Sequence, residues 1–193
     1  SIGGIWENLN PEICSITSNG TVTGIASGIA NARFVMPISG CISDILSIEV
    51  LPKPLVNIIG NDTICAFSTT QLTPINGGTW QSKNPQIAII SNYGLVTGIS
   101  EGEVRFAWTD ASSGCTSEES EPIKVLPQPI IAASSQNICL GQTLTLSPIS
   151  GGVWENLNQD IVTISNNIVT AIKSGKAKLK FTENTHNCSN SIE

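Results

Sequence analysis

The sequence repeats itself, and this feature limits the possible folds more than any other. Gly3-Gly4-Ile5-Trp6 recurs as Gly77-Gly78-Thr79-Trp80 and as Gly151-Gly152-Val153-Trp154, so the Gly-Gly pairs begin 74 residues apart. The strings SNGTVTG (18–24), SNYGLVTG (91–98) and SNNIVTA (165–171) follow in the same order, and the linkers VLPKP (50–54) and VLPQP (125–129) also match. Self-similarity at a fixed period indicates tandem copies of one structural module.

We therefore predict three modules in tandem. Repeat 1 covers residues 1–51 and lacks the first strands of the module. Repeat 2 covers residues 52–126 and is complete, whereas repeat 3 covers residues 127–193 and lacks only its last strand. Because residue 1 falls inside the repeated pattern and no signal peptide precedes it, we expect the chain to belong to a longer protein.

Apolar and polar residues alternate within each repeat, which is typical of strands buried on one face. The expected inward positions are Ala30, Ala32 and Phe34 in repeat 1, Val104, Phe106 and Trp108 in repeat 2, and Ala177, Leu179 and Phe181 in repeat 3. The Asn-Gly and Tyr-Gly pairs of the second repeated string predict tight hairpin turns. Short strands separated by frequent turns predict an all-β fold of small antiparallel β-sandwiches.

Charge and composition exclude several classes of function. The formal net charge is −6, and nine Lys and Arg against 15 Asp and Glu leave no basic surface for a nucleic-acid partner. No run of about 18 apolar residues is present, so we expect no membrane span. The chain has a single His and no Ser/His/Asp set, paired acidic motif or phosphate-binding loop, so we expect no enzyme activity, no cofactor and no metal site.

The six cysteines predict structural disulfides, because they are even in number and form no Cys-x-x-Cys pair. Such bonds persist in oxidising surroundings, so we expect an exported protein. The strand that carries Cys65 should run parallel beside the last strand of its repeat and start near the turn that carries Cys115. The predicted pairs are Cys65–Cys115, Cys139–Cys188 and Cys14–Cys41.

Two alternatives to this pairing stay open. Cys41–Cys65 and Cys115–Cys139 would join successive repeats, but the extended path through the linker separates them by more than the about 7 Å that a disulfide spans. Cys14 has no counterpart in the other repeats. In the second alternative, Cys14 is therefore a buried thiol, and Cys41 forms a disulfide with a cysteine outside this chain.

Other candidate residues have both a structural and a functional interpretation. Trp6, Trp80 and Trp154 are predicted as core anchors, with stacking on a carbohydrate as the alternative. His186 is expected to be a loop residue rather than a metal ligand, because no second His is present. Three charged groups remain. The first is Lys176, Lys178 and Lys180, which form either a solvated face or a contact with a glycan. The second is Glu118, Glu119 and Glu121, which lack the spacing of a calcium-binding loop, and the third is the pair of turn carboxylates Asp62 and Asp110, which have no visible partner.

The string from Trp80 to Gly102 resembles the group 2 bacterial immunoglobulin-like (BIG2) module. With Ile64-Cys65 and Gly114-Cys115, the repeats are similar to those of very large Bacteroidota surface proteins such as SprB-type gliding-motility adhesins. The resemblance covers the whole chain, although Val169-Thr170-Ala171 of repeat 3 replaces the Val-Thr-Gly of the motif. It implies an all-β tandem array of small Ig-like antiparallel β-sandwiches, about 74 residues per repeat.

The same resemblance implies a function outside the cell. We expect part of a stalk or filament of a cell-surface adhesin. Its expected partners are neighbouring Ig-like repeats of the same chain, together with surface polysaccharide or other cell-surface proteins. Asp62-Thr63-Ile64 is similar to a Bacteroidota O-glycosylation motif, which makes Thr63 a candidate for modification. The alternatives are repeats that bind a glycan or protein directly and an accessory region of a secreted enzyme.

Overall fold

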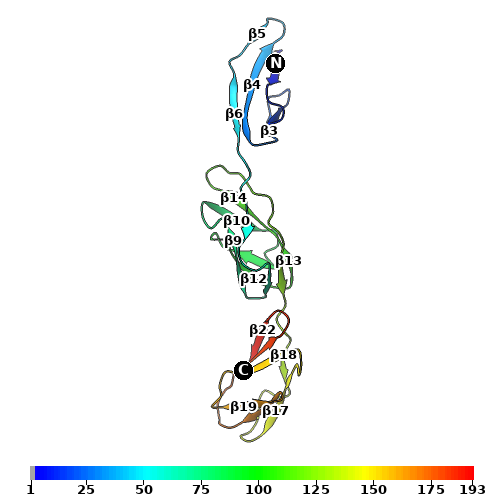
Figure 1. Cartoon of the computed structure of the whole chain (residues 1–193), viewed down its shortest axis with the longest axis vertical. Coiled ribbons are helices and arrows are strands. Elements are labelled where there is room, and N and C mark those ends of the chain that lie inside the picture. Colours follow the sequence, from blue (N-terminus) through cyan, green and yellow to red (C-terminus); the bar gives the residue numbers. More distant parts are fainter. Residues whose placement is uncertain (1–2) are drawn as a thin grey trace. The chain divides into compact units, whose positions relative to one another are not determined.

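The computed structural model describes residues 3–193, which form 22 β-strands and no helix (Figure 1). The predicted all-β fold is confirmed. The strands of repeat 1 are β1 (Ile5–Asn8), β2 (Cys14–Ile16), β3 (Val22–Gly24), β4 (Gly28–Met36), β5 (Cys41–Ile42) and β6 (Leu46–Val50). None of the described residues forms an apolar helix of membrane-spanning length.

The other strands are assigned in the same way. Those of repeat 2 are β7 (Asn57–Ile58), β8 (Thr63–Cys65), β9 (Thr69–Thr73), β10 (Gly78–Ser82), β11 (Ala88–Ile90), β12 (Leu95–Gly98), β13 (Gly102–Val104), β14 (Phe106–Asp110) and β15 (Ile123–Leu126). Those of repeat 3 are β16 (Ala132–Ala133), β17 (Thr143–Ser147), β18 (Gly152–Asn156), β19 (Val162–Ser165), β20 (Ile168–Ala171), β21 (Leu179–Glu183) and β22 (Ser189–Ile192).

Repeat 2 shows how the sheets of one repeat are built. One sheet has the strand order β11-β12-β9-β7, and another has the order β13-β15-β8. The strands pair antiparallel, except that β8 runs parallel to the last strand β15. The two sheets bury Leu72, Val96, Ile123 and Val125 completely. Burial of these aliphatic side chains is the main source of stability in a domain of this size.

The predicted inward positions are confirmed. Seven of the nine side chains are buried, and only Phe34 and Ala177 are half-buried. In repeat 3, Leu179 belongs to a core cluster with Leu146, Val162 and Val169. Alternation in sequence therefore identified the covered faces of the strands.

The two predicted hairpins are formed by β2–β3 and β11–β12, and repeat 3 has a third hairpin, β19–β20. Gly20 and Gly94 take positive φ angles of 87° and 74° in the first two turns. Repeat 3 lacks this glycine, yet Asn166 and Asn167 take φ angles of 49° and 62°, and Ser165 still pairs with Ile168. Asn enters the left-handed region more readily than most residues, so the hairpin forms without glycine.

The Cα positions divide the described chain into two compact units. The first unit combines the described residues up to Leu55 with Gly77–Thr79 and Trp108–Glu118. The second unit holds Val56–Asn76, Trp80–Ala107 and Glu119–Glu193. These units do not follow the repeat boundaries, so the division into residues 1–51, 52–126 and 127–193 stays a prediction.

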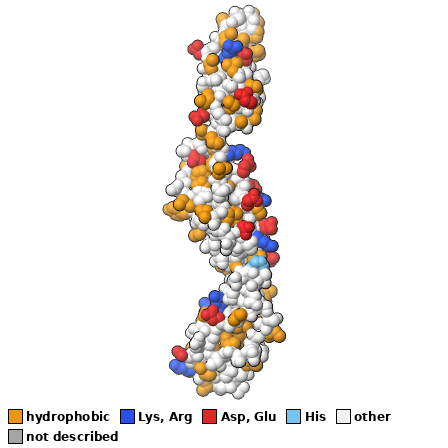
Figure 2. All heavy atoms as spheres, viewed as in Figure 1, with side chains coloured by type: hydrophobic (Ala, Val, Ile, Leu, Met, Phe, Trp, Pro, Cys, Tyr) orange, Lys and Arg blue, Asp and Glu red, His pale blue; other side chains and the backbone are white. Residues whose placement is uncertain are grey.

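Repeat 1 has two strand edges without a partner among residues 3–193. β6 pairs only with β4, and β3 pairs only with β2. In repeat 2 the equivalent strands β15 and β12 have second partners, β8 and β9. As a result Val22 of β3 is 37% exposed, whereas its equivalent Val96 is 0% exposed. Hydrophobic side chains are scattered over the face shown in Figure 2, and Ile25, Ile29 and Ile45 of repeat 1 are among the exposed ones.

Candidate functional site

A disulfide bond joins repeat 2 to repeat 3. It links Cys65, the last residue of β8, to Cys188, which lies directly before β22 and 123 residues later in sequence. Their Cα atoms are 5.5 Å apart, within the range that a disulfide requires. Both cysteines belong to the second compact unit. The bond is therefore a covalent link between two successive repeats.

The predicted pairs Cys65–Cys115 and Cys139–Cys188 are wrong, and the register of one strand explains why. β8 does run parallel to β15, but Cys65 lies opposite Leu126, next to the linker that leads into repeat 3. Cys115 lies in the loop between β14 and β15 and belongs to the other compact unit. Cys65 therefore lies at the end of β15 that leads into repeat 3, whereas the Cys115 loop precedes the opposite end of β15, where Lys124 pairs with Thr63.

The other four cysteines, Cys14, Cys41, Cys115 and Cys139, are unbonded among residues 3–193. The predicted bond Cys14–Cys41 is therefore wrong, and the alternative pairs Cys41–Cys65 and Cys115–Cys139 are not formed either. Cys14 is completely buried on β2, where its Sγ lies 3.8 Å from Asn8 Oδ1. Cys41 is exposed on β5, opposite Met36. Cys14 is thus the buried thiol of the second alternative.

Glu183 holds the loop that presents Cys188. This residue ends β21, and its carboxylate accepts hydrogen bonds from the backbone N–H groups of Thr185 at 2.6 Å, His186 at 2.7 Å and Cys188 at 3.1 Å. Burial raises the pKa of Glu183, but the hydrogen bonds to the loop outweigh burial and bring the pKa down to about 2. The carboxylate is therefore charged at neutral pH and keeps the loop closed around the cysteine.

Repeat 2 builds the same kind of loop around Cys115. Asp110 ends β14, and its carboxylate accepts hydrogen bonds from the Ser112 hydroxyl at 2.6 Å and from the Ser113 N–H and hydroxyl, both at 2.8 Å. These hydrogen bonds lower the pKa of Asp110 to about 2, and the bond from the Ser112 hydroxyl has the largest effect. The Asp110 N–H donates to the Cys115 carbonyl at 2.9 Å, just as the Glu183 N–H donates to the Cys188 carbonyl at 3.0 Å.

The prediction that Asp110 has no partner is therefore wrong, and Glu183 was missed altogether. Both residues stand five positions before a cysteine. An acidic residue at this fixed distance is the sequence signal that would have found the two loops, because a carboxylate at the start of a turn can accept several backbone N–H groups.

The three tryptophans pack to different degrees. Trp80 is 8% exposed, whereas Trp6 and Trp154 are half-buried. Trp80 and Trp154 each donate an indole N–H hydrogen bond, at 2.9 Å, to the carbonyl of the proline six residues earlier. Trp6 contacts Phe34, and Trp154 contacts Phe181, with ring centroids 5.3 Å and 5.2 Å apart. Their role as core anchors stays a prediction, for which mutation is the test.

The other sequence candidates lie at the surface. His186 Nδ1 is 3.9 Å from Glu183 Oε1, and Lys178 is exposed. Three of the candidates form ion pairs: Glu118 with Lys53, Glu119 with Lys83, and Lys176 with Glu193. Within residues 3–193, no group of three or more His, Cys, Asp and Glu is placed to hold a metal ion.

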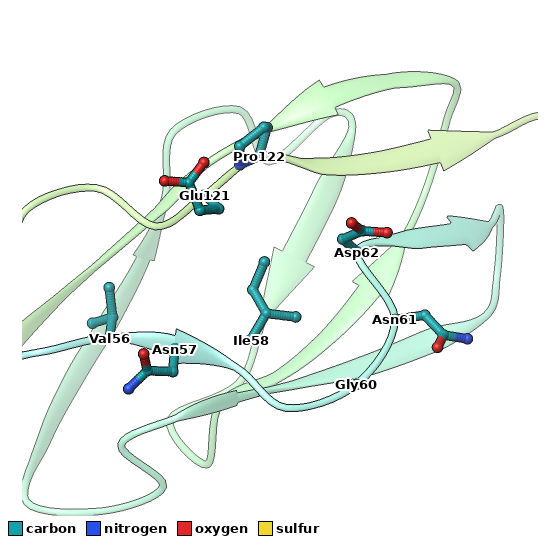
Figure 3. Close-up of a pocket in the computed structure, with 8 residues that line it drawn as sticks. All are labelled: Val56, Asn57, Ile58, Gly60, Asn61, Asp62, Glu121 and Pro122. Atoms are coloured by element: carbon teal, nitrogen blue, oxygen red, sulfur yellow. The ribbon is translucent and has the colours of Figure 1, made fainter.

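Two hollows occur in the second compact unit. One, of about 660 Å³, is bordered by β7 and the turn before β8 on one side and by Glu121 and Pro122 on the other (Figure 3). Asp62 lines this hollow, and the Thr63 hydroxyl donates to the Asp62 carboxylate at 3.2 Å. Thr63 is half-buried on β8, and its modification stays a prediction. The other hollow, of about 930 Å³, lies in repeat 3 and is lined partly by core residues such as Val169.

Comparisons with known proteins concern the fold. No protein-family model matches the chain, and no curated protein is significantly similar to it. The S-layer protein SbsC, domains 4 and 5, is 18% identical over 64% of this chain and 70% of that chain, with a TM-score of 0.27. Intimin in complex with the intimin-binding domain of its translocated receptor is 15% identical, over 68% of this chain and 54% of that chain, with a TM-score of 0.37.

Invasin, a bacterial integrin-binding protein, is 13% identical over 98% of this chain, with a TM-score of 0.36. The chain spans 50% of the invasin structure. At these levels of identity, the similarity is one of fold alone.

Proposed function

We propose that this chain is a structural segment of a large secreted or cell-surface adhesin, in which successive Ig-like repeats form a stalk that extends an adhesive tip. The observation that carries the proposal is the Cys65–Cys188 bond between repeats. A spacer gains from a covalent link that limits movement between its modules, whereas an independent binding module does not require one. Pro52, Pro54, Pro127 and Pro129 also restrict the backbone of both linkers.

An extracellular location is part of the same proposal. The disulfide supports it, because such bonds form and persist in oxidising compartments. The resemblance to BIG2 modules and to SprB-type gliding-motility adhesins supports a surface filament. On this proposal the partners are neighbouring repeats of the same protein, with surface polysaccharide or other surface proteins at the adhesive part, and no catalytic step is assigned to these residues.

Small-angle X-ray scattering of the purified chain tests the spacer role. Without reductant, the scattering of the wild type should fit a narrow distribution of the radius of gyration. Cys188→Ser should widen that range and raise the radius of gyration, because repeats 2 and 3 lose their covalent link. Cys115→Ser is the matched control, since its thiol is unbonded here. Equal scattering from all three proteins would contradict a joint that the bond restrains.

The hollow in Figure 3 favours a second candidate function, direct binding of a glycan. Asn57, Asn61, Asp62 and Glu121 provide amide and carboxylate groups at its border, and such groups bind sugar hydroxyls. A glycan array with the whole chain tests this candidate. Binding that Asp62→Ala abolishes would support the lectin-like role, whereas binding that survives the substitution would exclude this hollow as its site.

A further inference from the structure

The chain contains two Asn-Gly pairs, Asn19-Gly20 and Asn76-Gly77. Asparagine is a thermolabile residue, and a following glycine has no side chain to keep its backbone nitrogen away from the carbon of the Asn amide. Both glycines take a positive φ angle, 87° at Gly20 and 83° at Gly77. The two pairs therefore differ in what surrounds them, and not in the φ angle of the glycine.

Hydrogen bonds hold the first pair in place. The Asn19 Oδ1 atom accepts the Thr21 N–H at 3.3 Å, the Thr21 hydroxyl at 3.0 Å and the Thr17 hydroxyl. The Gly20 N–H donates to the Thr17 carbonyl at 2.9 Å, and a side chain at Gly20 would collide with the Trp6 indole. The turn between β2 and β3 thus fixes both the side-chain amide and the backbone nitrogen of this pair.

The second pair has none of these restraints. Asn76 and Gly77 are both exposed, and within residues 3–193 no hydrogen bond involves the Asn76 side chain or the Gly77 N–H. The equivalent of Asn76 in repeat 3 is Ser150, and Gly151 after it takes a φ angle of 82°, as Gly77 does. The bend that leads into β10 therefore does not require an asparagine.

We propose that Asn76 is a site of spontaneous chemical modification, at which its amide is converted into aspartate and isoaspartate. The Gly77 nitrogen forms a bond to Cγ of Asn76 and gives up its proton, the Cγ–Nδ2 bond breaks, and ammonia leaves with that proton. Water then opens the cyclic imide. Cleavage of the bond from the Gly77 nitrogen to Cγ gives aspartate, and cleavage of its bond to the backbone carbonyl carbon gives isoaspartate.

Isoaspartate at this position would disturb the start of β10. It adds one carbon to the backbone between Pro74 and Trp80, whose indole N–H donates to the Pro74 carbonyl at 2.9 Å. Gly78 lies so close to β14 that a side chain there would collide with Trp108. A lengthened backbone cannot keep both contacts, so the modification should loosen the core of repeat 2 with time. This inference goes beyond the stalk role and does not depend on it.

Storage of the purified whole chain at mildly alkaline pH tests the proposal. Peptide mapping by mass spectrometry follows both asparagines, and methylation by protein isoaspartate methyltransferase identifies isoaspartate. We expect Asn76 to convert at least about tenfold faster than Asn19, because the bonds at Asn19 must open first and one net hydrogen bond is worth a factor of up to about ten. In urea, where both turns unfold, the two rates should become similar.

Two variants are matched controls. Asn76→Ser copies Ser150, so it should fold like the wild type, form no isoaspartate at this position and keep its melting temperature during storage, whereas that of the wild type falls. Thr17→Val removes one hydroxyl donor to Asn19 and should speed the conversion of Asn19 alone.

The proposal is overturned if Asn76 keeps its amide in the folded chain, or if it converts no faster than Asn19. An equal loss of melting temperature in stored Asn76→Ser and stored wild type would overturn the effect on β10.

Discussion

Replacing Cys188 with Ser should destabilise the chain more than replacing any of the four unbonded cysteines, because it removes the Cys65–Cys188 bond. The bond joins residues 123 positions apart, and the chain-entropy model assigns about 5 kcal/mol to a loop of this length. For a protein of this size, each kcal/mol shifts the melting temperature by about 2–4 °C. We therefore expect the unfolding transition that includes repeats 2 and 3 to fall by roughly 10–20 °C.

Thermal melts followed by circular dichroism in the absence of reductant measure this effect. Wild type with added reductant should melt at the temperature of Cys188→Ser, because both then lack the same bond. Cys115→Ser provides the control, since it removes an unbonded and half-buried thiol. The reasoning is refuted if Cys188→Ser and Cys115→Ser melt at the same temperature, because the bond would then contribute nothing to stability.

Three further predictions concern packing, charge and boundaries. Trp80→Ala should cost about 3–5 kcal/mol, visible as a lower urea midpoint; an unchanged midpoint with loss of a ligand would favour stacking. Asp110 and Glu183 have folded pKa values of about 2, below their ordinary values, so their stabilisation is present above about pH 4.5 and is lost as the pH falls towards 2. Melting temperature should fall across that window, and less steeply in Glu183→Gln; parallel curves would contradict this role. Residues 55–126 alone should fold cooperatively and residues 1–51 alone should not; a sharp melt of the latter would disprove the repeat boundaries.

Local sequence patterns predicted most of the fold. The alternation around Phe106 and Phe181 identified the buried faces, because side chains on a strand must alternate and only one face of these strands meets the core. The third hairpin shows why the exact turn residue mattered less. Asn166 and Asn167 reach the same left-handed conformation as glycine, so the pairing of β19 with β20 is unaffected.

The disulfide partner could not be predicted in the same way. Repeat spacing placed Cys65 on a strand parallel to the last strand, which is correct. The partner of Cys65, however, depends on which end of β15 lies beside it. The register of the three residue pairs between β8 and β15 places Cys65 opposite Leu126, at the end that leads into repeat 3. Local periodicity contains no information on the neighbouring repeat, so it could not reveal that Cys188 approaches from there.

The Cys65–Cys188 bond also determines how the chain would respond to a pulling force applied at its two ends. Tension would pass from Cys65 directly to Cys188, and the residues between them would carry no load. With 123 residue spacings enclosed by the bond, roughly 430 Å of contour length, at about 3.5 Å per residue, could not be released. A single-molecule extension trace would therefore be shorter by this length when oxidised than when reduced, and repeats 2 and 3 would resist stretching as one element.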